Sequence, residues 1–287
     1  MSMRWGVEQR LEFIDFRLYW EGGINRSEII DQFSISVPQA SIDLSLYEER
    51  APGNLVYDKS AKRYFAAANF SPKFFKPDAD QYLSKLRGVT DHMVNRTETW
   101  LSRVPDAESM PLPHRRVDAE VLRIVLSTIR KEKSVKILYQ SMNSDRPEPL
   151  WRWISPHALA NDGLRWHVRA FCHLDRRFKD FLLSRCLGTD GEHDQGAPAV
   201  QDSNWNELFS VVLVPNPELS TNQQIIVAQD YCMEDGRIAI PVRKSLLYYF
   251  RKRLRLDVAQ ALDNIREMPV VVENRDEFEV ALAEADK

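Results

Sequence analysis

The sequence predicts an α+β chain in three parts: helices closed by a hairpin, then a group of short strands, then a small unit in which strands and helices alternate. Helical periodicity dominates residues 4–50, and period-two alternation dominates residues 134–186. Two polar stretches with proline or glycine, 102–115 and 188–204, interrupt these patterns and indicate linkers. The expected segments are a helical domain at 1–70, a helical connector and linker at 71–115, a strand-rich domain at 116–190 and an α+β domain at 203–287.

Composition indicates a soluble globular protein. The 287 residues are 44% hydrophobic and 28% charged, and 39 basic against 42 acidic residues give a net charge of −3. This balance does not indicate nucleic-acid binding, which would have to come from local basic patches. No apolar run approaches the roughly 20 residues of a membrane span, and Met1–Arg10 lacks the apolar core of a signal peptide. Three cysteines without CxxC spacing fit reduced thiols, so we expect a cytoplasmic protein with no membrane association.

Turn and capping signals delimit the first two helices. Residues 4–20 carry an apolar helical stripe, and Gly22 and Gly23 end this helix. In "NRSEIIDQF", Asn25 is a suitable N-cap, and Glu28 stands three residues later at capping-box spacing. A short break then precedes another helix, so this part has the spacing of a helix-turn-helix.

The third helix, "SVPQASIDLSLYEER", carries the candidate DNA contacts. Ser36 and Gln39 have capping-box spacing, and Pro38 falls in the first turn, where its missing N–H costs little. The exposed start of the helix is small and polar, which suits a helix whose N-terminus enters the major groove. Free N–H groups there attract phosphate, and glutamine can pair with adenine. The expected contacts are Ser36, Pro38, Gln39 and Ser41.

The stretch "LVYDKSAKRYFAA" predicts a β-hairpin with residues 58–62 at its tip. A basic hairpin after such a helix is typical of the wing of a winged helix, whose cations contact phosphate. The expected contacts are Lys59, Lys62 and Arg63. The alternative is an ordinary three-helix domain with a solvated hairpin, but the order of capped helix and basic hairpin favours DNA binding.

A helical connector follows the hairpin. In "FSPKFFKPDADQYLSKLRGV", Tyr82, Leu83 and Leu86 form an apolar stripe. We expect this helix either to mediate dimerisation or to cover the winged helix, and the sequence leaves both open.

The central part opens with an amphipathic helix at 117–130, followed by about five short strands. Four strands can be placed: "SVKILYQS", "LWRWISPHAL" ended by Pro156, and the two strands of residues 164–186. One helix followed by short strands with little glycine predicts a small, strongly bent barrel or sandwich.

A row of cationic side chains stands in "DGLRWHVRAFC". Period two puts Arg165, His167 and Arg169 on the face opposite the apolar residues, and Lys179 and Arg185 share one face of the next strand. If these strands pair, the cations can converge, and a cluster of like charges favours an anion such as phosphate. Aromatic rings that could stack a base beside them are Tyr139, Trp153 and Phe171.

Two other interpretations of this region are possible. The cations could form a solvated face paired with Asp162, Asp175 and Asp180. A metal site is not expected, because no spacing matches a zinc pattern and cationic neighbours oppose a cation. Its candidate ligands would be His157, His167, Cys172, His173 and Cys186. We therefore expect neither a metal nor another cofactor.

The C-terminal part alternates strand, helix, strand and helix. A strand is expected at 208–214, a helix after Pro217, a strand in "GRIAIPV" and a helix at 245–254. The basic run Arg251–Arg255 is expected to be a solvated helix end, favoured by the helix dipole, and contact with nucleic acid or a partner subunit is the alternative.

The central part resembles a WYL domain. The resemblance rests on a strand ending Tyr-x-Ser, an Arg before Pro-His, a Trp-centred strand, and a closing Phe-x-x-Ser-Arg. The matching residues are Tyr139, Ser141, Arg152, Pro156, His157, Phe181, Ser184 and Arg185, with Trp166-His167-Val168 where the family has its eponymous tripeptide. The resemblance implies an Sm-like β-barrel that binds a regulatory ligand, often a nucleotide or nucleic acid. The expected ligand residues are Tyr139, Ser141, Arg152, His157, His167, Arg169, Lys179 and Arg185.

Over residues 5–260 the chain resembles the bacterial regulators of anti-phage defence loci of the BrxR and CapW type. The resemblance implies a repressor that binds a palindromic operator as a homodimer through its C-terminal part, and that leaves DNA when a nucleotide or oligonucleotide effector binds. Two-fold symmetry also has a physical reason, because one winged helix contacts too few base pairs for useful specificity. We expect the protein in the bacterial cytoplasm, associated with the nucleoid.

Two further function classes are weighed against this one. A nucleic-acid-processing enzyme would use the basic cluster as its active site, and a constitutive RNA- or single-strand-binding module would use the basic barrel face. The sequence has no Walker A, HExxH, GxSxG, Rossmann or zinc-deaminase pattern and no compact acidic trio for two-metal chemistry. No catalytic residues are therefore expected.

Overall fold

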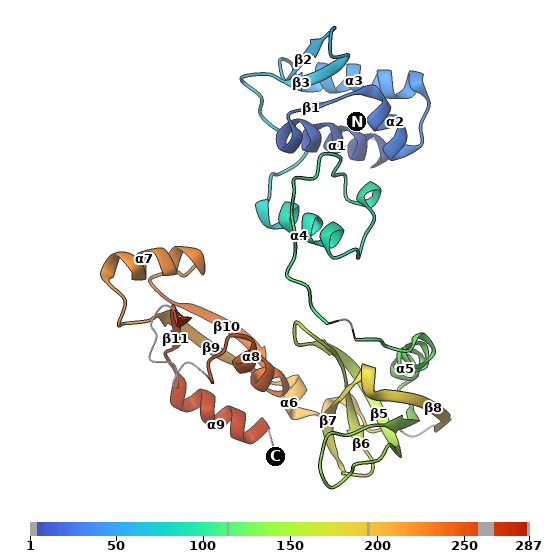
Figure 1. Cartoon of the computed structure of the whole chain (residues 1–287), viewed down its shortest axis with the longest axis vertical. Helices are drawn as coiled ribbons and strands as arrows, with labels where there is room; N and C mark the ends of the chain where they lie inside the picture. The colour runs from blue at the N-terminus through green and yellow to red at the C-terminus, as the bar shows by residue number, and fades with distance from the viewer. Residues whose placement is uncertain (1–4, 114, 194–195, 258–266, 286–287) are drawn as a thin grey trace. The chain divides into compact units, whose positions relative to one another are not determined.

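The computed structural model describes residues 5–113, 115–193, 196–257 and 267–285. The chain divides into two compact units, residues 1–112 and 113–287 (Figure 1). Both mix helix and sheet, as the α+β prediction requires. Within the described ranges, no helix combines the length and apolarity needed to cross a membrane.

The N-terminal unit is a winged helix followed by a helical connector. Its helices are α1 (Trp5–Glu21), α2 (Arg26–Phe33), α3 (Val37–Arg50), α4 (Ala79–Thr90) and the 3-10 turn η1 (Arg96–Glu98), and its strands are β1 (Gly23–Ile24), β2 (Leu55–Asp58) and β3 (Arg63–Ala66). The strands pair antiparallel in the order β1-β3-β2. At Gly23 a Cβ atom would lie 2.6 Å from the carbonyl oxygen of Tyr64, so only glycine fits beside β3.

Local capping explains where α2 and α3 begin. Asn25 and Glu28 form the predicted capping box, and Ser34, with φ 51°, ends α2 in the left-handed region. The Ser36 hydroxyl accepts from the backbone nitrogen of Gln39, as predicted. The second half of the predicted box is wrong, because the Gln39 side chain donates to Asp43 at 3.0 Å.

A buried carboxylate joins the connector to the winged helix. Asp15 on α1 accepts from the Tyr47 hydroxyl and, at 2.5 Å each, from the backbone nitrogens of Lys73 and Phe74. Burial, followed by the bond to Asp15, raises the pKa of Tyr47. These bonds fix the start of the connector against the helical core.

Helix α4 covers the winged helix, one of the two expected roles of the connector. The Tyr82 ring stacks on Trp20 with centroids 4.5 Å apart and lies 6.4 Å from Phe16, both on α1. Trp100, further along the connector, packs against Phe13 at 5.6 Å. Dimerisation by this helix stays a prediction.

The central part is a helix on a bent antiparallel sheet. Its elements are α5 (Ala119–Lys131), β4 (Ser134–Tyr139), β5 (Leu150–Asn161), β6 (Trp166–Cys172), β7 (Arg177–Leu182), the 3-10 turn η2 (Leu183–Arg185) and β8 (Cys186–His193). The strands pair in the order β7-β6-β5-β4-β8. For the described residues, this pairing does not itself join β7 to β8 to close a barrel.

Two sequence expectations here are wrong. Pro156 does not end β5; the strand runs on to Asn161 through a register shift, in which His157 is the extra residue between Pro156 and Ala158. Gly188–His193, expected as linker, is part of β8 and pairs with β4. A bulge thus accommodates the proline, and an edge strand tolerates the glycines.

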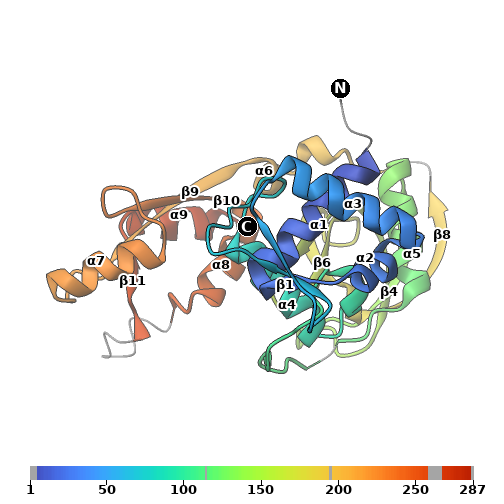
Figure 2. The same cartoon turned by 90° about the horizontal axis from the view of Figure 1, so that it is seen from above.

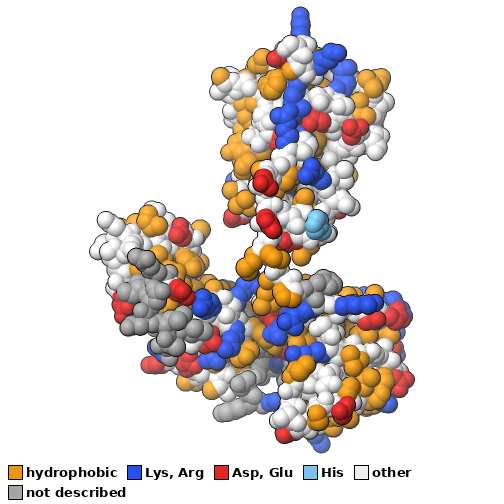
Figure 3. Space-filling view, in the orientation of Figure 1, with side chains coloured by type: hydrophobic (Ala, Val, Ile, Leu, Met, Phe, Trp, Pro, Cys, Tyr) orange, Lys and Arg blue, Asp and Glu red, His pale blue; other side chains and the backbone are white. Residues whose placement is uncertain are grey.

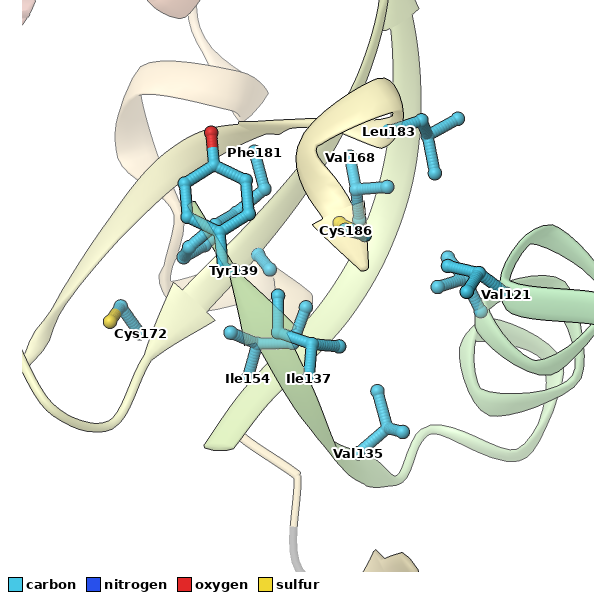
Figure 4. Close-up of a cluster of buried hydrophobic side chains, with 12 residues drawn as sticks. Val121, Val135, Ile137, Tyr139, Ile154, Val168, Cys172, Phe181, Leu183 and Cys186 are labelled. Carbon is cyan, nitrogen blue, oxygen red and sulfur yellow. The ribbon is translucent and has the colours of Figure 1, made fainter. Parts of the chain in front are cut away.

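The core of the central part lies between α5 and the inner face of the sheet (Figure 4). Val121 from α5 faces Val135 and Ile137 from β4, while the Tyr139 hydroxyl points away from the aliphatic side chains. Tyr139 and Phe181 meet edge to face with centroids 5.0 Å apart. Cys172 and Cys186 lie in this core as free thiols.

The C-terminal part is a three-stranded sheet covered by helices (Figure 2). Its elements are the 3-10 turn η3 (Ala199–Gln201), α6 (Ser203–Asn206), β9 (Leu208–Pro215), α7 (Thr221–Asp230), β10 (Ile238–Arg243), the 3-10 turn η4 (Lys244–Leu246), α8 (Leu247–Arg253), β11 (Val270–Val272) and α9 (Arg275–Ala285). The strand order is β10-β9-β11, all antiparallel. The four predicted elements are confirmed as β9, α7, β10 and α8, whereas β11 and α9 were not anticipated.

Candidate functional site

The exposed face of α3 differs in detail from the predicted DNA contacts. Ser36 and Pro38 are exposed at the start of the helix. The Ser41 hydroxyl donates to the carbonyl of Val37 at 3.0 Å. The Gln39 amide donates to Asp43, whose carboxylate also pairs with Arg10 at 2.6 Å. Adenine recognition by Gln39 would therefore require that it give up an existing hydrogen bond.

The wing presents two exposed lysines. Asp58 organises the hairpin turn by accepting from the Ser60 nitrogen at 2.7 Å and the Ser60 hydroxyl at 2.6 Å. These bonds lower the pKa of the Asp58 carboxyl. Lys59 and Lys62 project from this turn and are exposed. Figure 3 shows Lys and Arg side chains following a strip down one face of the N-terminal unit.

Arg63 does not lie where a phosphate contact needs it. Its side chain is only 10% exposed; its guanidinium bonds Glu28 at 3.0 Å and the Gly23 carbonyl at 2.6 Å. Glu28 also pairs with Arg17. The charge of Arg63 is therefore neutralised inside the domain, and it serves to join the wing to α2 rather than to meet DNA.

Sequence reasoning overlooked cations at the helix ends beside the wing. Arg26 and Ser27 are exposed at the first turn of α2, and Arg50 is exposed at the end of α3. The signal for the first pair was present, since both residues stand inside the Asn25–Glu28 capping box. A helix start that exposes a cation and a hydroxyl suits a phosphate contact.

The cationic strand residues do not converge in one pocket. In the β6–β7 ladder Arg169 is opposite Asp180, and Ala170 is opposite Lys179. Side chains of neighbouring positions point to opposite faces of a sheet. Lys179 therefore lies on the inner face with Phe181, while Arg169 lies on the outer face, and the predicted single cluster is corrected to two.

The outer group, called here the junction cluster, consists of His157, Arg169, Asp180 and Asp202. Arg169, 5% exposed, donates to Asp202 from Nε at 2.7 Å and Nη2 at 2.9 Å, and it lies 3.4 Å from Asp180. His157 Nε2 lies 2.9 Å from Asp202. Burial would raise the pKa of Asp202, but the bonds from His157 and Arg169 outweigh it and lower the pKa to about 2.

Asp202 belongs to the segment that enters the C-terminal part, where it also caps α6 by accepting from the Trp205 nitrogen. The junction cluster therefore joins the WYL-like sheet to that part. His167 makes a second link: its ring lies 4.6 Å from that of Tyr249 on α8, and its Nε2 is 2.9 Å from Asp162. Both histidines and Arg169, predicted as ligand residues, are occupied by internal carboxylates.

The inner group, called here the Asp175 cluster, consists of Arg146, Arg152, Asp175 and Lys179. Arg146 and Lys179 each lie 2.8 Å from the Asp175 carboxylate, and Arg152 Nη1 lies 3.8 Å from it. Burial would raise the pKa of Asp175, but hydrogen bonds from Lys179 and Arg146 outweigh it and hold that pKa well below its ordinary value. Three cations surround this single carboxylate.

Arg152 is the most unusual member of the Asp175 cluster. Its side chain is 2% exposed, yet its Nε and Nη2 atoms have no hydrogen-bond partner among the described residues. Its guanidinium lies 5.4 Å from the Tyr139 ring centroid and 6.0 Å from that of Phe181. Buried N–H groups left unpaired cost about 1–3 kcal/mol each, so this position favours an anionic acceptor.

Tyr139 and Arg185 border the same place. Burial raises the pKa of Tyr139, and hydrogen bonds to its hydroxyl from the Leu182 nitrogen at 3.2 Å and from Arg185 oppose that effect. Ser141, half-buried, accepts from the Asn143 nitrogen at 3.1 Å. Sequence reasoning missed Arg146, which the loop before β5 brings to Asp175 from a position without strand periodicity.

Of the three rings proposed to stack a base, only Tyr139 lies on the inner face. Trp153 and Phe171 alternate with the inner-face residues and therefore lie outside. Trp153 packs against His193 at 6.0 Å, and Phe171 packs against Phe178 at 5.2 Å. The inner site therefore offers one aromatic ring beside several cations.

No constellation for catalysis is found among the described residues. Two serines contact His173, whose Nε2 lies 2.7 Å from Ser155 Oγ and 3.2 Å from Ser134 Oγ. The Ser155 oxygen also accepts from the Ala197 nitrogen at 2.9 Å and lies 2.8 Å from Ser134 Oγ. Ser155 is 2% exposed, so it joins segments of the fold and is not presented to a substrate. The described part of the chain contains no group of three or more His, Cys, Asp or Glu side chains placed to hold a metal ion.

Comparison with known families covers most of the chain. Residues 6–88 match the BrxR transcriptional regulator winged helix-turn-helix domain, residues 120–188 match the WYL domain, and residues 208–278 match the BrxR transcriptional regulator C-terminal dimerization domain.

Two relatives are similar over nearly the whole chain. The DNA-binding transcriptional repressor CapW of Escherichia coli (strain KTE188) is 38% identical over 275 residues, which cover 96% of this chain and 91% of that protein. CapW of Stenotrophomonas maltophilia is 39% identical over 279 residues, with 96% and 92% covered. Among solved structures, the proteasome accessory factor PafBC of Arthrobacter aurescens is 14% identical with a TM-score of 0.30, and the match covers 96% of this chain and 46% of that one.

Proposed function

Because the chain belongs to the family of the CapW and BrxR transcriptional regulators, we propose that it is a dimeric repressor that binds a palindromic duplex operator and is released by an anionic effector. The observation that carries the proposal is a winged helix whose α3 and wing leave Ser36, Pro38, Lys59 and Lys62 exposed. Its site of action would be the bacterial cytoplasm, at the nucleoid.

Wing lysines supply the phosphate contacts in this proposal. Lys59 and Lys62 stand at the tip of an ordered hairpin, and no described carboxylate forms an ion pair with either. Each lysine that neutralises a phosphate releases counterions, so log K changes with log salt by about 0.9 per contact. Arg26 would add a contact from the start of α2.

This part of the proposal is tested by titrating a duplex from the gene's own upstream region at several salt concentrations. Lys62→Ala should weaken binding and reduce the salt slope by about one. Lys76→Ala, an exposed lysine outside α3 and the wing, should leave the slope unchanged. An unchanged slope in both Lys59→Ala and Lys62→Ala removes the wing from the interface. Tighter binding of short single strands than of duplex at the same salt would favour a single-strand-binding module.

The C-terminal part supplies the dimer contact. Ile225 and Ile226 on α7 are 51% and 55% exposed, an arrangement costly in water and suited to a second copy of the chain. Ile226→Glu should convert the dimer to a monomer in sedimentation experiments and lower operator affinity. A variant that remains dimeric would exclude α7 from the interface.

The effector would bind at the Asp175 cluster. Arg146, Arg152, Lys179 and the adjacent Arg185 outnumber the one carboxylate, and the unpaired N–H groups of Arg152 suit a phosphate oxygen. The Tyr139 ring would lie beside the base of a nucleotide or short oligonucleotide. In this scheme the effector competes with Asp175 for the cations.

Strand β7 offers a physical route from that site to the dimerisation part. Lys179 contacts Asp175 on one face of β7, while its neighbour Asp180 lies beside Arg169 on the other face. A shift of β7 that releases Lys179 from Asp175 would therefore also alter the junction cluster. Such a shift would change how the two DNA-binding domains of a dimer are spaced.

Operator release tests the effector site. The probes are inorganic pyrophosphate, a dinucleotide and a hexanucleotide, added to the wild-type chain bound to its operator. Arg152→Met, which keeps an unbranched apolar stem and removes the guanidinium, should keep operator affinity and lose release by whichever probe acts on the wild type. Arg123→Gln, which removes an exposed cation of α5, should respond as the wild type does. Loss of operator affinity in a folded Arg152→Met variant, or normal release from it, would exclude this effector site.

A further inference from the structure

The exposed face of α3 carries two aliphatic side chains, Val37 at the first residue of the helix and Ile42 near its middle. Ile42 is 58% exposed and Val37 is 53% exposed. Ile42 borders a shallow surface hollow, whose lining residues are Ser41, Ile42, Ser45, Leu46 and Glu49. The helix packs on its neighbours through a different set of residues, Ala40, Leu44 and Tyr47, so folding of the domain does not require an isoleucine at position 42.

An exposed isoleucine in the middle of a helix needs a reason. β-branched side chains lose rotamer freedom in helices, and a large exposed aliphatic surface is unfavourable in water. Lysine, glutamate or glutamine at position 42 would favour both the helix and its solubility. An apolar partner that covers Ile42 in the functional complex provides the reason.

Two of the polar side chains that the sequence places on the exposed start of α3 are engaged within the helix. From Val37 to Glu49 the helix contains no lysine or arginine. The Gln39 amide is bonded to Asp43, and the Ser41 hydroxyl is bonded to the Val37 carbonyl. Two polar contacts expected from the sequence are thus engaged within the helix, whereas the aliphatic surface of Ile42 is open.

In the major groove of duplex DNA, one unmodified base presents an apolar group: thymine, through its C5-methyl. We propose that Ile42 contacts the C5-methyl group of a thymine in each operator half-site and is a specificity-determining residue of this protein. This inference rests on the proposed function, since it assigns a base contact to the α3 of a DNA-binding winged helix. It predicts a protein that selects thymine at that position by apolar contact rather than by a bidentate hydrogen bond.

Uracil, which lacks only the methyl group, is the direct probe. Duplexes selected from a random pool by the full-length protein give the preferred half-site. Each thymine in it is then replaced singly by deoxyuridine, and affinity is measured at one salt concentration. At one position per half-site the wild type should bind about fourfold more weakly, the factor that corresponds to one methyl group removed from water. Replacement in both half-sites should multiply the two factors.

Two alanine variants of the protein are measured on the same thymine and uracil duplexes. Ile42→Ala should bind the thymine duplex more weakly and should show no uracil penalty at that position. Leu83→Ala on α4 removes an equally exposed side chain, 57% against 58%, and should keep the wild-type uracil penalty. Both sites are exposed, and alanine favours helix, so both variants should fold.

The outcomes distinguish a failure of the Ile42 contact from a failure of the proposed function. A selected duplex that the wild type binds equally well with every thymine replaced by uracil overturns the Ile42 contact and leaves the proposed function standing. If replacing thymine by uracil weakens binding of Ile42→Ala as much as it weakens binding of the wild type, the Ile42 contact is also overturned. A selection that enriches no duplex overturns the proposed function, and the Ile42 contact with it.

Discussion

Asp202→Asn should destabilise the second compact unit, residues 113–287, more than any conservative change of a surface carboxylate does. The Asp202 side chain is 1% exposed and accepts from Arg169 at 2.7 and 2.9 Å and from His157 at 2.9 Å. An asparagine keeps the shape but turns an NH2 group toward one of these donors. The remaining amide oxygen can accept from Arg169, but among the described carboxylates the guanidinium would keep only Asp180, at 3.4 Å, as an ion-pair partner. Loss of one member of a buried ion pair costs about 3–5 kcal/mol, and we expect about 3 kcal/mol here.

Urea unfolding followed by circular dichroism measures this cost. With a slope of about 3 kcal/mol per molar urea, the transition of this unit should move down by about 1 M. The matched control is Asp190→Asn, since the Asp190 carboxylate is 65% exposed and 3.5 Å from Lys136. Such a pair contributes less than about 1 kcal/mol. Equal midpoints for the two variants would show that the junction cluster does not hold the WYL domain to the C-terminal part.

Arg63→Ala should lower the stability of the N-terminal unit by about 2 kcal/mol, because it breaks the largely buried pair with Glu28, whereas Lys62→Ala should leave it unchanged; equal thermal midpoints would contradict the separation of the two roles. The carboxyl pKa values of Asp162 and Asp202 are lowered to about 2 by hydrogen bonds that outweigh burial. Since these folded-state pKa values lie below the unfolded value of 3.8, the ionised carboxylates stabilise the fold fully above about pH 4, and this stabilisation is lost as pH falls toward 2. A urea midpoint that stays constant from pH 6 to 2.5 would refute this. Asp175→Asn should bind pyrophosphate more tightly than the wild type in calorimetry, because the competing carboxylate is gone, and weaker binding would argue against competition.

Much of the fold follows from local signals in the sequence. The Asn25 capping box, the Ser36 N-cap and the basic hairpin each act within a few residues, so the winged helix could be predicted and is confirmed. The order of helix α5 and strands β4 to β7 in the central part was also visible in its periodicity. Short elements without a pattern were missed: β11 has three residues, and β8 is rich in glycine and acidic residues.

The site was harder to predict because it depends on register and on distant partners. Period two places Arg169 on one face, but only the pairing of β6 with β7 shows that Lys179 lies on the other. Asp202 stands 33 residues beyond Arg169, and no local pattern connects them. The sequence suggested Asp162, Asp175 and Asp180 as alternative partners of the cations, and all three do form such pairs. Burial of these pairs was not predictable from strand alternation.

The measurement that tests the central claim most directly is a footprint of the purified full-length protein over its gene's own upstream region. The account predicts one protected site composed of two half-sites related by two-fold symmetry, with centres separated by a multiple of roughly 10.5 base pairs. Uniform protection that does not depend on sequence, or a single half-site without its symmetry mate, would contradict a dimeric operator-binding repressor.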